Sequence, residues 1–383
     1  MNAATAITSQ RCSTLKRAVV AVASLVVYLS LFRASADPIN VDVDLYTNVG
    51  GSTQSLKVQQ HTHVAAMLSA YHFNNRNGDI VPKYASAGTC GEGGQGVNLR
   101  ISRVEYKGNL MQGLKRFEAS KGRCLTTIPD AILCCQSSSN TMPFATVTGL
   151  RGVPQISYSA SSPDLSDQER YPYFARACPS DSSIAPVFVH LFEEQRISQI
   201  AILYEDDAWG KALFKAIYEI GRRQGLEVIG FSFTSSEPQT TVMEKIDALK
   251  ARDLHMGGIA LWPVTVETLM PRMVEKGLFD AHTFWVFLDF FKSDFNAWVQ
   301  RDAKFAKFAS ALVGHANLKA RASLDINRGF QNYKNAYIGG RDYGSAEVMM
   351  LNKKYNMSLP PTFFANTKDT SEWADSLACK TMI

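Results

Sequence analysis

Serine-rich segments follow two short apolar runs and are the first candidates for ligand chemistry. The run Asp130–Cys135 leads into "QSSSN" (Gln136–Asn140), and the run Val153–Tyr158 leads into "SASSPDLSD". Hydroxyls and free backbone N–H groups at the start of a helix can bind an anion, but the same residue types also cap helices and form turns. From the residues alone, both interpretations of these segments stay open.

Aromatic and acidic side chains follow two other apolar runs. Trp209 lies in "EDDAWG" after the run Gln199–Tyr204, where it could belong to a core or form an aromatic wall, although its polar neighbours favour a loop. Asp289 follows the run Thr283–Leu288, where its carboxylate could cap a helix or accept a ligand ammonium. Both residues are therefore candidates for a ligand site.

Motifs of enzymes and of metal sites are missing from the sequence, which has no G-x-x-x-x-G-K-[ST], no H-E-x-x-H and no G-x-S-x-G. The string "GEGGQG" (Gly91–Gly96) matches a dinucleotide-binding pattern, but it precedes the run Leu99–Tyr106 instead of following a strand, so we interpret it as a loop. His61 and His63 are i, i+2 neighbours that do not face each other on a helix, so we expect surface or cap positions. We predict no enzyme activity, no cofactor and no metal.

The first 36 residues have the pattern of a secretory leader. The basic residues Arg11, Lys16 and Arg17 precede the apolar run Ala18–Phe32, and "ASA" at Ala34–Ala36 resembles a cleavage site. The run is shorter than the roughly 20 residues that span a bilayer, so we favour a cleaved signal peptide over a signal anchor. Without these three residues and Arg33, 36 basic and 35 acidic residues leave a net charge of +1, which gives no reason to expect nucleic acid as a partner.

Six cysteines remain after the leader, an even number that fits disulfides in an exported protein. Cys90 and Cys124 both lie in loop-like sequence and are the preferred disulfide pair. Cys134 ends an apolar run and could be a buried small hydrophobe, and the cysteine spacings match no zinc pattern. The sequon "NMS" makes Asn356 a glycosylation candidate, which also fits export.

Short apolar runs alternate with helical patterns from about residue 55 onward. The run Gln199–Tyr204 is continuously apolar, as in a strand that is covered on both faces. Strict alternation predicts right-handed βαβ units, parallel sheets and an α/β fold, in which ligands bind outside the carboxyl ends of the strands. The predicted strands are Leu99–Tyr106, Asp130–Cys135, Val153–Tyr158, Gln199–Tyr204, 227–233, 256–262 and Thr283–Asp289, and the predicted helices are Ser55–Gly78, 109–123, 141–152, Ser182–Arg196, 209–225, 241–253 and 266–279.

Four strings occur in an order that resembles the extracellular ligand-binding region of class C G-protein-coupled receptors. They are "SSS", "SYSAS", "DAWG" and "FLD", and "YPYFARACPSD" lies between the second and the third. The similarity runs from about residue 40 to the end and extends to natriuretic peptide receptors. It implies a two-lobed periplasmic-binding-protein-like clamshell, in which each lobe is a parallel sheet flanked by helices. The implied parts are a signal peptide or signal anchor (1–36), lobe one (37–176), lobe two (177–315) and an incomplete segment that returns to lobe one (316–383).

The resemblance also implies roles for the candidate residues. In the amino-acid receptors of this family, two hydroxyl-bearing loops of lobe one hold the α-carboxylate of the ligand. An aromatic residue before a glycine on lobe two falls on Trp209, and an acid that takes the α-ammonium falls on Asp289. This agrees with the chemistry, because hydroxyls and N–H groups suit a carboxylate and a carboxylate suits an amine. The implied ligand contacts are Ser138, Ser139, Ser159, Ala160, Ser161, Trp209 and Asp289.

The sequence departs from the family pattern at several points. "CCQ" stands where the family usually has a Gly-Pro-Gly-type lead into the first serine string, and Trp209 replaces the tyrosine of glutamate-type members. No basic residue for a distal carboxylate can be assigned, so glutamate is not favoured over a γ-amino acid or another small amine-bearing acid. The chain stops inside the helix that resembles the family's return to lobe one, so we expect either a truncated gene model or a short soluble form.

These observations predict an extracellular receptor domain that closes on a small amino-acid-like ligand and signals by lobe closure. The alternatives are a secreted solute-binding protein for amino acids and the ectodomain of a guanylyl-cyclase-type hormone receptor, whose ligand lies outside the cleft. We expect a homo- or heterodimer through lobe one, and membrane attachment only through an uncleaved leader or missing C-terminal spans. The expected location is the secretory pathway or the cell exterior, or the plasma membrane if the chain is part of a full-length receptor.

Overall fold

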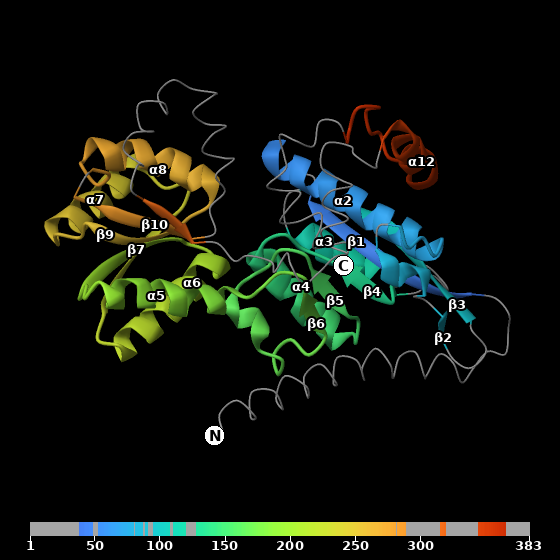
Figure 1. Cartoon of the computed structure of the whole chain (residues 1–383), viewed down its shortest axis with the longest axis horizontal. Coiled ribbons are helices and arrows are strands. Elements are labelled where there is room, and N and C mark those ends of the chain that lie inside the picture. The colour runs from blue at the N-terminus through green and yellow to red at the C-terminus, as the bar shows by residue number, and fades with distance from the viewer. Residues whose placement is uncertain are drawn as a thin grey trace.

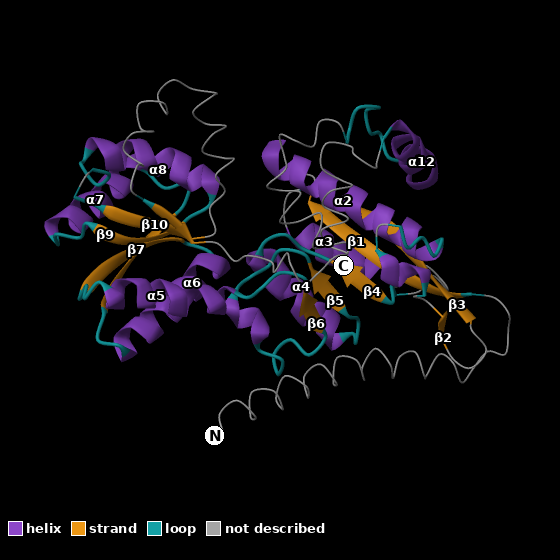
Figure 2. Ribbon diagram, viewed as in Figure 1, coloured by secondary structure: helices purple, strands orange, loops and turns teal. Residues whose placement is uncertain are grey.

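The molecule consists of two α/β lobes that lie side by side (Figure 1). Each lobe has one β-sheet with helices packed against it (Figure 2). The two-lobed α/β fold with parallel sheets that the sequence predicts is therefore confirmed. This computed structural model describes residues 38–48, 53–79, 81–86, 89–90, 95–107, 110–119, 128–280, 282–288, 315–318 and 344–364.

Within the described ranges, the sheet of lobe one has six strands in the order β2-β3-β1-β4-β5-β6. Its neighbouring strands are parallel, except that β2 runs antiparallel to β3. The parallel strands end at one edge of the sheet, so the segments that follow β4 and β5 lie next to each other. The strands are β1 (Ile39–Asn48), β2 (Thr89–Cys90), β3 (Gln95–Tyr106), β4 (Ala131–Leu133), β5 (Gln155–Ser157) and β6 (Phe174–Arg176).

Strand β1 is absent from the sequence-based expectations, which begin at residue 55. It lies between β3 and β4 near the centre of the sheet, and Leu45 is fully buried. Apolar and polar residues alternate at Val41, Asp42, Val43 and Asp44, which is the pattern of a half-buried strand. The signal for this strand is therefore present in the sequence.

The helices of lobe one cover both faces of its sheet. Helix α2 (Thr53–Asn74) forms one apolar cluster with α12 (Ser345–Tyr355), which lies beside it in Figure 1. Helices α3 (Leu110–Ala119) and α4 (Ser138–Leu150) belong to a second cluster that includes β1. In this second cluster the rings of Tyr46 and Phe144 meet edge to face, with 5.2 Å between centroids.

The described part of lobe two contains a sheet of five parallel strands in the order β11-β10-β9-β7-β8. The strands are β7 (Gln199–Glu205), β8 (Glu227–Phe233), β9 (Met256–Ala260), β10 (Phe284–Leu288) and β11 (Ala316–Leu318), and the helices are α5 (Ile184–Glu194), α6 (Ala208–Arg223), α7 (Gln239–Ala251) and α8 (Pro263–Glu275).

Strand β7 is buried on both faces, as its continuous apolar sequence predicts. Ile200 and Ile202 belong to the cluster that contains α5 and α6, whereas Ala201 and Leu203 belong to the cluster that contains α7 and α8. All four side chains are fully buried. The alternation of side chains across a strand therefore supplies both layers of the lobe-two core.

The expectation that His61 and His63 occupy surface or cap positions is wrong. Both side chains are buried in α2. His61 is covered by the C-terminal segment, where its ring lies tilted against that of Phe363 with 4.9 Å between centroids, whereas His63 lies near Arg103 of β3. Burial, with a smaller contribution from Arg103, lowers the pKa of His63 to about 3, so this imidazole is neutral at physiological pH.

The lobe boundaries at residues 37, 177 and 316 stay predictions. Strand β11 begins at Ala316 and pairs with β10 of lobe two, whereas α12 packs on α2 of lobe one. Among the residues that the structure describes, none of the helices has both the length and the apolar character needed to cross a membrane. The leader lies outside these residues.

Gly257 is required where β9 crosses the centre of the lobe-two sheet. Its φ is +155°, and a Cβ there would lie 1.7 Å from the carbonyl oxygen of Ala201 in β7. We expect Gly257→Ala to lower the free energy of unfolding by roughly 4 kcal/mol or more. The matched control is Gly225→Ala, which has φ +78° and open space around the added Cβ and should cost about 1–2 kcal/mol. Urea unfolding of both variants measures the two losses in the free energy of unfolding. Equal losses for Gly257→Ala and Gly225→Ala would contradict the prediction.

Candidate functional site

The first serine segment forms the start of α4, directly after β4. Ser137 is the N-cap of the helix, and its side chain accepts a 3.4 Å hydrogen bond from the backbone N–H of Asn140. Ser138 is buried and its Oγ accepts a 3.2 Å hydrogen bond from the backbone N–H of Ser162. The first serine segment therefore both caps α4, through Ser137, and contacts the second serine segment, through Ser138.

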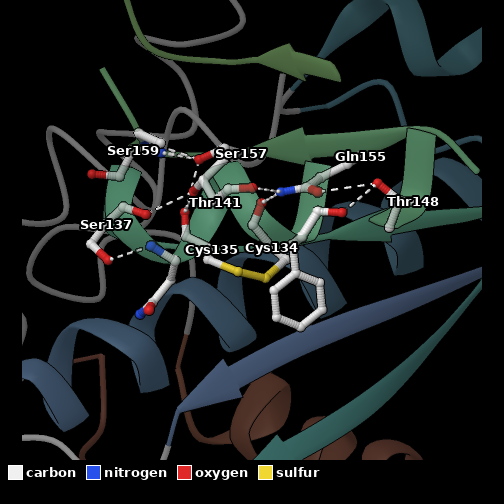
Figure 3. Close-up of a disulfide and its surroundings, with 11 residues drawn as sticks. Cys134, Cys135, Ser137, Thr141, Thr148, Gln155, Ser157 and Ser159 are labelled. Carbon is white, nitrogen blue, oxygen red and sulfur yellow. Dashed lines mark hydrogen bonds between the residues drawn. A yellow bond between two sulfur atoms is a disulfide. The ribbon is translucent and has the colours of Figure 1, made fainter. Parts of the chain in front are cut away.

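A disulfide between the neighbouring residues Cys134 and Cys135 precedes this segment (Figure 3). Cys134 is fully buried, as expected for a small hydrophobe, but its pairing with Cys135 is not among the sequence-based expectations. The carbonyl oxygen of Cys135 accepts a 2.8 Å hydrogen bond from Ser157 Oγ, and that of Cys134 accepts one of 3.2 Å from Gln155 Nε2. The preferred pair Cys90–Cys124 stays a prediction, because Cys124 lies outside the described residues.

The second serine segment turns back over the end of β5. The backbone N–H groups of Ser159 and Ala160 donate to Ser157 Oγ at 3.3 and 2.9 Å, so one buried hydroxyl holds the turn against Cys135. Arg176 of β6 also fixes this segment, because its guanidinium donates to the carbonyl oxygen of Ser162 at 2.7 Å. Burial lowers the pKa of Arg176, and the neighbouring Cys178 and Asp181 oppose this shift.

Asp181 follows β6 in the connection between the two lobes. Its backbone N–H donates to the carbonyl oxygen of Ser161 at 2.9 Å, and its Oδ2 accepts a 2.7 Å hydrogen bond from Ser161 Oγ. The side chain is 2% exposed. Two hydrogen bonds with one residue therefore attach this buried carboxylate to the second serine segment of lobe one.

The first turn of α6 brings lobe two against these groups. Asp207 caps the helix by accepting from the N–H of Gly210 at 2.8 Å. Trp209 is 4% exposed, and its Nε1 donates to Asp181 Oδ2 at 2.6 Å. The backbone N–H of Ala208 donates to Ser139 Oγ at 3.4 Å. The first serine segment therefore bonds this helical turn directly, and the second is connected to it through Asp181.

Glycine at position 210 allows this turn to approach β7. A Cβ at Gly210 would lie 2.1 Å from the carbonyl oxygen of Glu205, so any other residue would push the start of α6 away from the strand. The occurrence of glycine directly after the aromatic residue thus has a physical cause. The glycine lets the start of α6 lie against β7, which places Trp209 beside Asp181.

A second tryptophan lies beside the first but stays within lobe two. The rings of Trp262 and Trp209 are tilted, with centroids 4.7 Å apart. Trp262 Nε1 donates to Asp207 Oδ2 at 3.0 Å, and its backbone N–H donates to Glu205 Oε2 at 3.1 Å. Trp209 therefore has both roles that the sequence left open, because it belongs to the lobe-two core cluster and also forms an aromatic wall with Trp262.

Glu205 ends β7 beneath this wall. Burial raises its pKa to about 7, and the neighbouring Asp207 and Asp206 add to the rise, while hydrogen bonds from Trp262 and Thr265 oppose it. The side chain is 6% exposed, so its charged form is poorly solvated. Near pH 7 this group is consequently divided between its charged and neutral forms.

The structure brings four of the sequence-predicted contacts together: Ser138, Ser139, Ser161 and Trp209. Ser159 and Ala160 lie in the same turn as Ser161, and Ala160 is 1% exposed. Asp289 lies outside the described residues, directly after β10. In the described part of the chain, no three His, Cys, Asp or Glu side chains are grouped so that they could hold a metal ion.

Sequence reasoning missed Asp181, Glu205 and Trp262 as members of the site. Asp181 ends the string "YPYFARACPSD", where an acid before a helix looks like an ordinary cap. Glu205 and Trp262 occur in the strand-end segments "YEDDAWG" and "WPVT". Placement at the carboxyl ends of β7 and β9 was the signal that could have identified these two.

Comparison with known proteins finds similarity to receptor ligand-binding regions. Residues 96–334 match the family described as "Receptor family ligand binding region". Metabotropic glutamate receptor 4 of Rattus norvegicus is 24% identical over 303 residues, which are 74% of this chain and 31% of that receptor. Metabotropic glutamate receptor 6 of Mus musculus is 25% identical over 304 residues, covering 74% and 33%, and receptor 8 of Homo sapiens is 29% identical over 153 residues, covering 37% and 17%. The chain thus spans about a third or less of the curated receptors it matches, and the resemblance inferred from the sequence is confirmed.

The raised pKa of Glu205 predicts a pH dependence of stability. Between about pH 4.5 and 7 the folded state keeps a proton that the unfolded state has lost, so stability falls as the pH rises through this window. We expect the Glu205 contribution to be roughly 1–3 kcal/mol. Urea unfolding of the wild type and Glu205→Gln from pH 4.5 to 8 measures it as the difference between the two pH profiles. If the free energies of unfolding of the two proteins changed with pH in parallel, the raised pKa of Glu205 would be contradicted.

Proposed function

Because the chain belongs to the family of receptor ligand-binding regions, we propose that it is an extracellular receptor domain that binds a small amine-bearing acid between its lobes. The observation that carries the proposal is that the first turn of α6 lies against the serine segments of lobe one at the carboxyl ends of the strands. It bonds the first segment through Ser139 and is connected to the second through Asp181. Open α/β sheets bind ligands at this edge.

The chemistry of the site suits a ligand with both an acid and an amine. A carboxylate can accept hydrogen bonds from serine hydroxyls and from the backbone N–H groups around them. The serines in question are Ser138, Ser139, Ser159 and Ser161. The carboxylates of Asp181 and Asp289 can accept from an ammonium group, and charge-assisted bonds of this kind are about twice as strong as neutral ones. An amino-acid-like ligand would meet both requirements.

Lobe closure is the proposed means of signalling. A ligand that contacts lobe one through serines and lobe two through Trp209 and Asp289 binds the closed arrangement better than the open one. This difference in affinity is what shifts the population toward closure. In a full receptor, a homo- or heterodimer formed through lobe one would transmit the change. No enzyme activity is needed for this role.

Binding of the ligand and the site of binding can be tested by calorimetry on the folded, secreted chain with L-glutamate, γ-aminobutyrate and other small amine-bearing acids. We expect at least one of them to bind. Asp289→Ala should weaken that binding by about 1.5–3 kcal/mol, because a hydrogen bond to a charged group is lost. Ser138→Ala should weaken it as well.

The matched control is Asp164→Ala, which removes an exposed carboxylate from the second serine segment and should leave the affinity unchanged. If no small amine-bearing acid binds to the folded chain, the proposal fails. If a ligand binds but Asp289→Ala and Ser138→Ala have no effect, the ligand lies outside the cleft, as in the guanylyl-cyclase-type alternative.

Export to the cell exterior predicts glycosylation at Asn356. This residue is exposed at the end of α12, and Ser358 of the sequon is exposed too. We expect the protein secreted from eukaryotic cells to lose mass on treatment with an N-glycosidase. Ser358→Ala should abolish the shift, and it is preferred to a change of Asn356, whose φ of 50° suits asparagine. An unmodified secreted chain would contradict the prediction.

A further inference from the structure

The disulfide between Cys134 and Cys135 constrains a very short piece of chain. It joins residues that are adjacent in the sequence, so the ring that it closes contains only the two cysteines themselves. Stabilisation by a disulfide grows with the length of the loop that it closes, because a longer loop has more conformational freedom to lose in the unfolded state. This disulfide therefore contributes little to the stability of the whole fold, and its effect is concentrated on the direction of the peptide groups of this dipeptide.

Strand β5 binds the backbone of the dipeptide through hydrogen bonds. The N–H of Cys134 donates to the carbonyl oxygen of Ile156 at 3.0 Å. The carbonyl oxygen of Cys134 accepts from Gln155 Nε2, and that of Cys135 accepts from Ser157 Oγ (Figure 3). The side chains of both cysteines, of Gln155 and of Ser157 are at most 3% exposed. Water therefore does not replace a bond that is lost when one of these carbonyl groups turns away.

The first serine segment is held by this dipeptide in two ways. It follows Cys135 directly in the chain and forms the first turn of α4. Gln155 also ties this turn to the dipeptide, because its Nε2 donates both to the carbonyl oxygen of Cys134 and, at 3.4 Å, to that of Thr141. The direction of the Cys134 carbonyl group therefore influences where α4 begins relative to β5.

The second serine segment depends on the carbonyl group of Cys135. Ser157 Oγ donates to this carbonyl oxygen and accepts from the backbone N–H groups of Ser159 and Ala160. A hydroxyl has a single proton to donate, so the bond to Cys135 leaves only the lone pairs of this oxygen for the turn. The Cys135 carbonyl therefore fixes the Ser157 hydroxyl in the orientation that holds the turn in place.

We infer that the Cys134–Cys135 disulfide is a positioning element of the proposed ligand site: by fixing the carbonyl groups of both cysteines, it holds the two serine segments in the arrangement that receives a ligand carboxylate. Its effect on ligand affinity rests on the proposed function, whereas its effect on the two segments follows from the hydrogen bonds within lobe one. Groups that are already ordered bind more tightly, because binding does not have to offset the entropy of ordering them.

Cys178 offers a matched control for the two cysteines. It is also buried, it follows β6 of the same sheet, and its thiol is not part of a disulfide. Cys178→Ala therefore removes a buried sulfur from the same lobe-end region without breaking a disulfide. Any effect that is specific to the Cys134–Cys135 disulfide should be missing from this variant.

Hydrogen–deuterium exchange of the ligand-free, full chain tests the positioning role. In the variant that combines Cys134→Ala with Cys135→Ala, we expect the amides of Ser159 and Ala160 to exchange roughly 2- to 10-fold faster than in the wild type, as for the loss of one neutral hydrogen bond. The amide of Asn140 in the first segment should exchange faster as well. The amides of β7 should keep the wild-type rate, and Cys178→Ala should match the wild type in both serine segments.

Peptide mapping without a reductant establishes the bond itself. Free thiols at Cys134 and Cys135 in the wild type, or bonds from them to other cysteines, would overturn the inference. Wild-type exchange rates in the folded double variant would overturn it too. Cys135→Ala alone breaks the same bond and gives the same comparison if the double variant does not fold. Loss of folding in both variants, measured by thermal unfolding, contradicts the inference, because the disulfide would then support the whole lobe.

Calorimetry with L-glutamate and γ-aminobutyrate separates this inference from the proposed function. An acid that binds the wild type should bind the double variant roughly 10-fold more weakly, because the segments must be ordered on binding. It should bind Cys178→Ala with unchanged affinity. Equal affinity of the wild type and the double variant would contradict the role in the ligand site. If neither acid binds the wild type while the serine segments of the double variant exchange faster, the disulfide positions the segments and the proposed ligand class fails.

Discussion

The buried carboxylate of Asp181 accepts hydrogen bonds from Ser161 of lobe one and from Trp209 of lobe two, at the place where a ligand is proposed to bind. A carboxylate with so little exposure is costly unless donors satisfy it. Ser161 and Trp209 supply two such donors, one from each side of the interface. Donors from both lobes therefore meet at this one charge, which connects the chemistry of the site to the arrangement of the fold.

Several local features exist to bring these groups within reach. The parallel strands of both sheets end at the interface, so the serine segments, Asp207 and Trp262 all gather there. Gly210 lets α6 begin directly against β7, and Ser157 holds the second serine turn against the disulfide of Cys134 and Cys135 (Figure 3). Each feature fixes the position of a donor or an acceptor, so the site depends on backbone placement as much as on the identity of its side chains.

The sequence was most informative where the physical signal is local. The apolar run of β7 predicted a strand that is buried on both faces, and the serine strings after β4 and β5 pointed to the correct edge of the sheet. Asp181 could not be identified in this way, because its role depends on Ser161, twenty residues earlier, and on Trp209, twenty-eight residues later. The burial of His61 was hidden for the same reason, since Phe363, which packs against its ring, comes from the far end of the chain.

The central claim is that Ser161 of lobe one and Trp209 of lobe two both bind the buried carboxylate of Asp181. The indole N–H resonances of the five tryptophans offer the most direct view of it. Trp285 is the internal reference, because its indole donates to the carbonyl oxygen of Leu278 within lobe two. We expect the Trp209 indole proton to exchange slowly with water and to shift when a bound amine-bearing acid saturates the cleft, while the Trp285 resonance stays in place. A Trp209 indole that exchanges as fast as an exposed one in the folded protein would contradict the account.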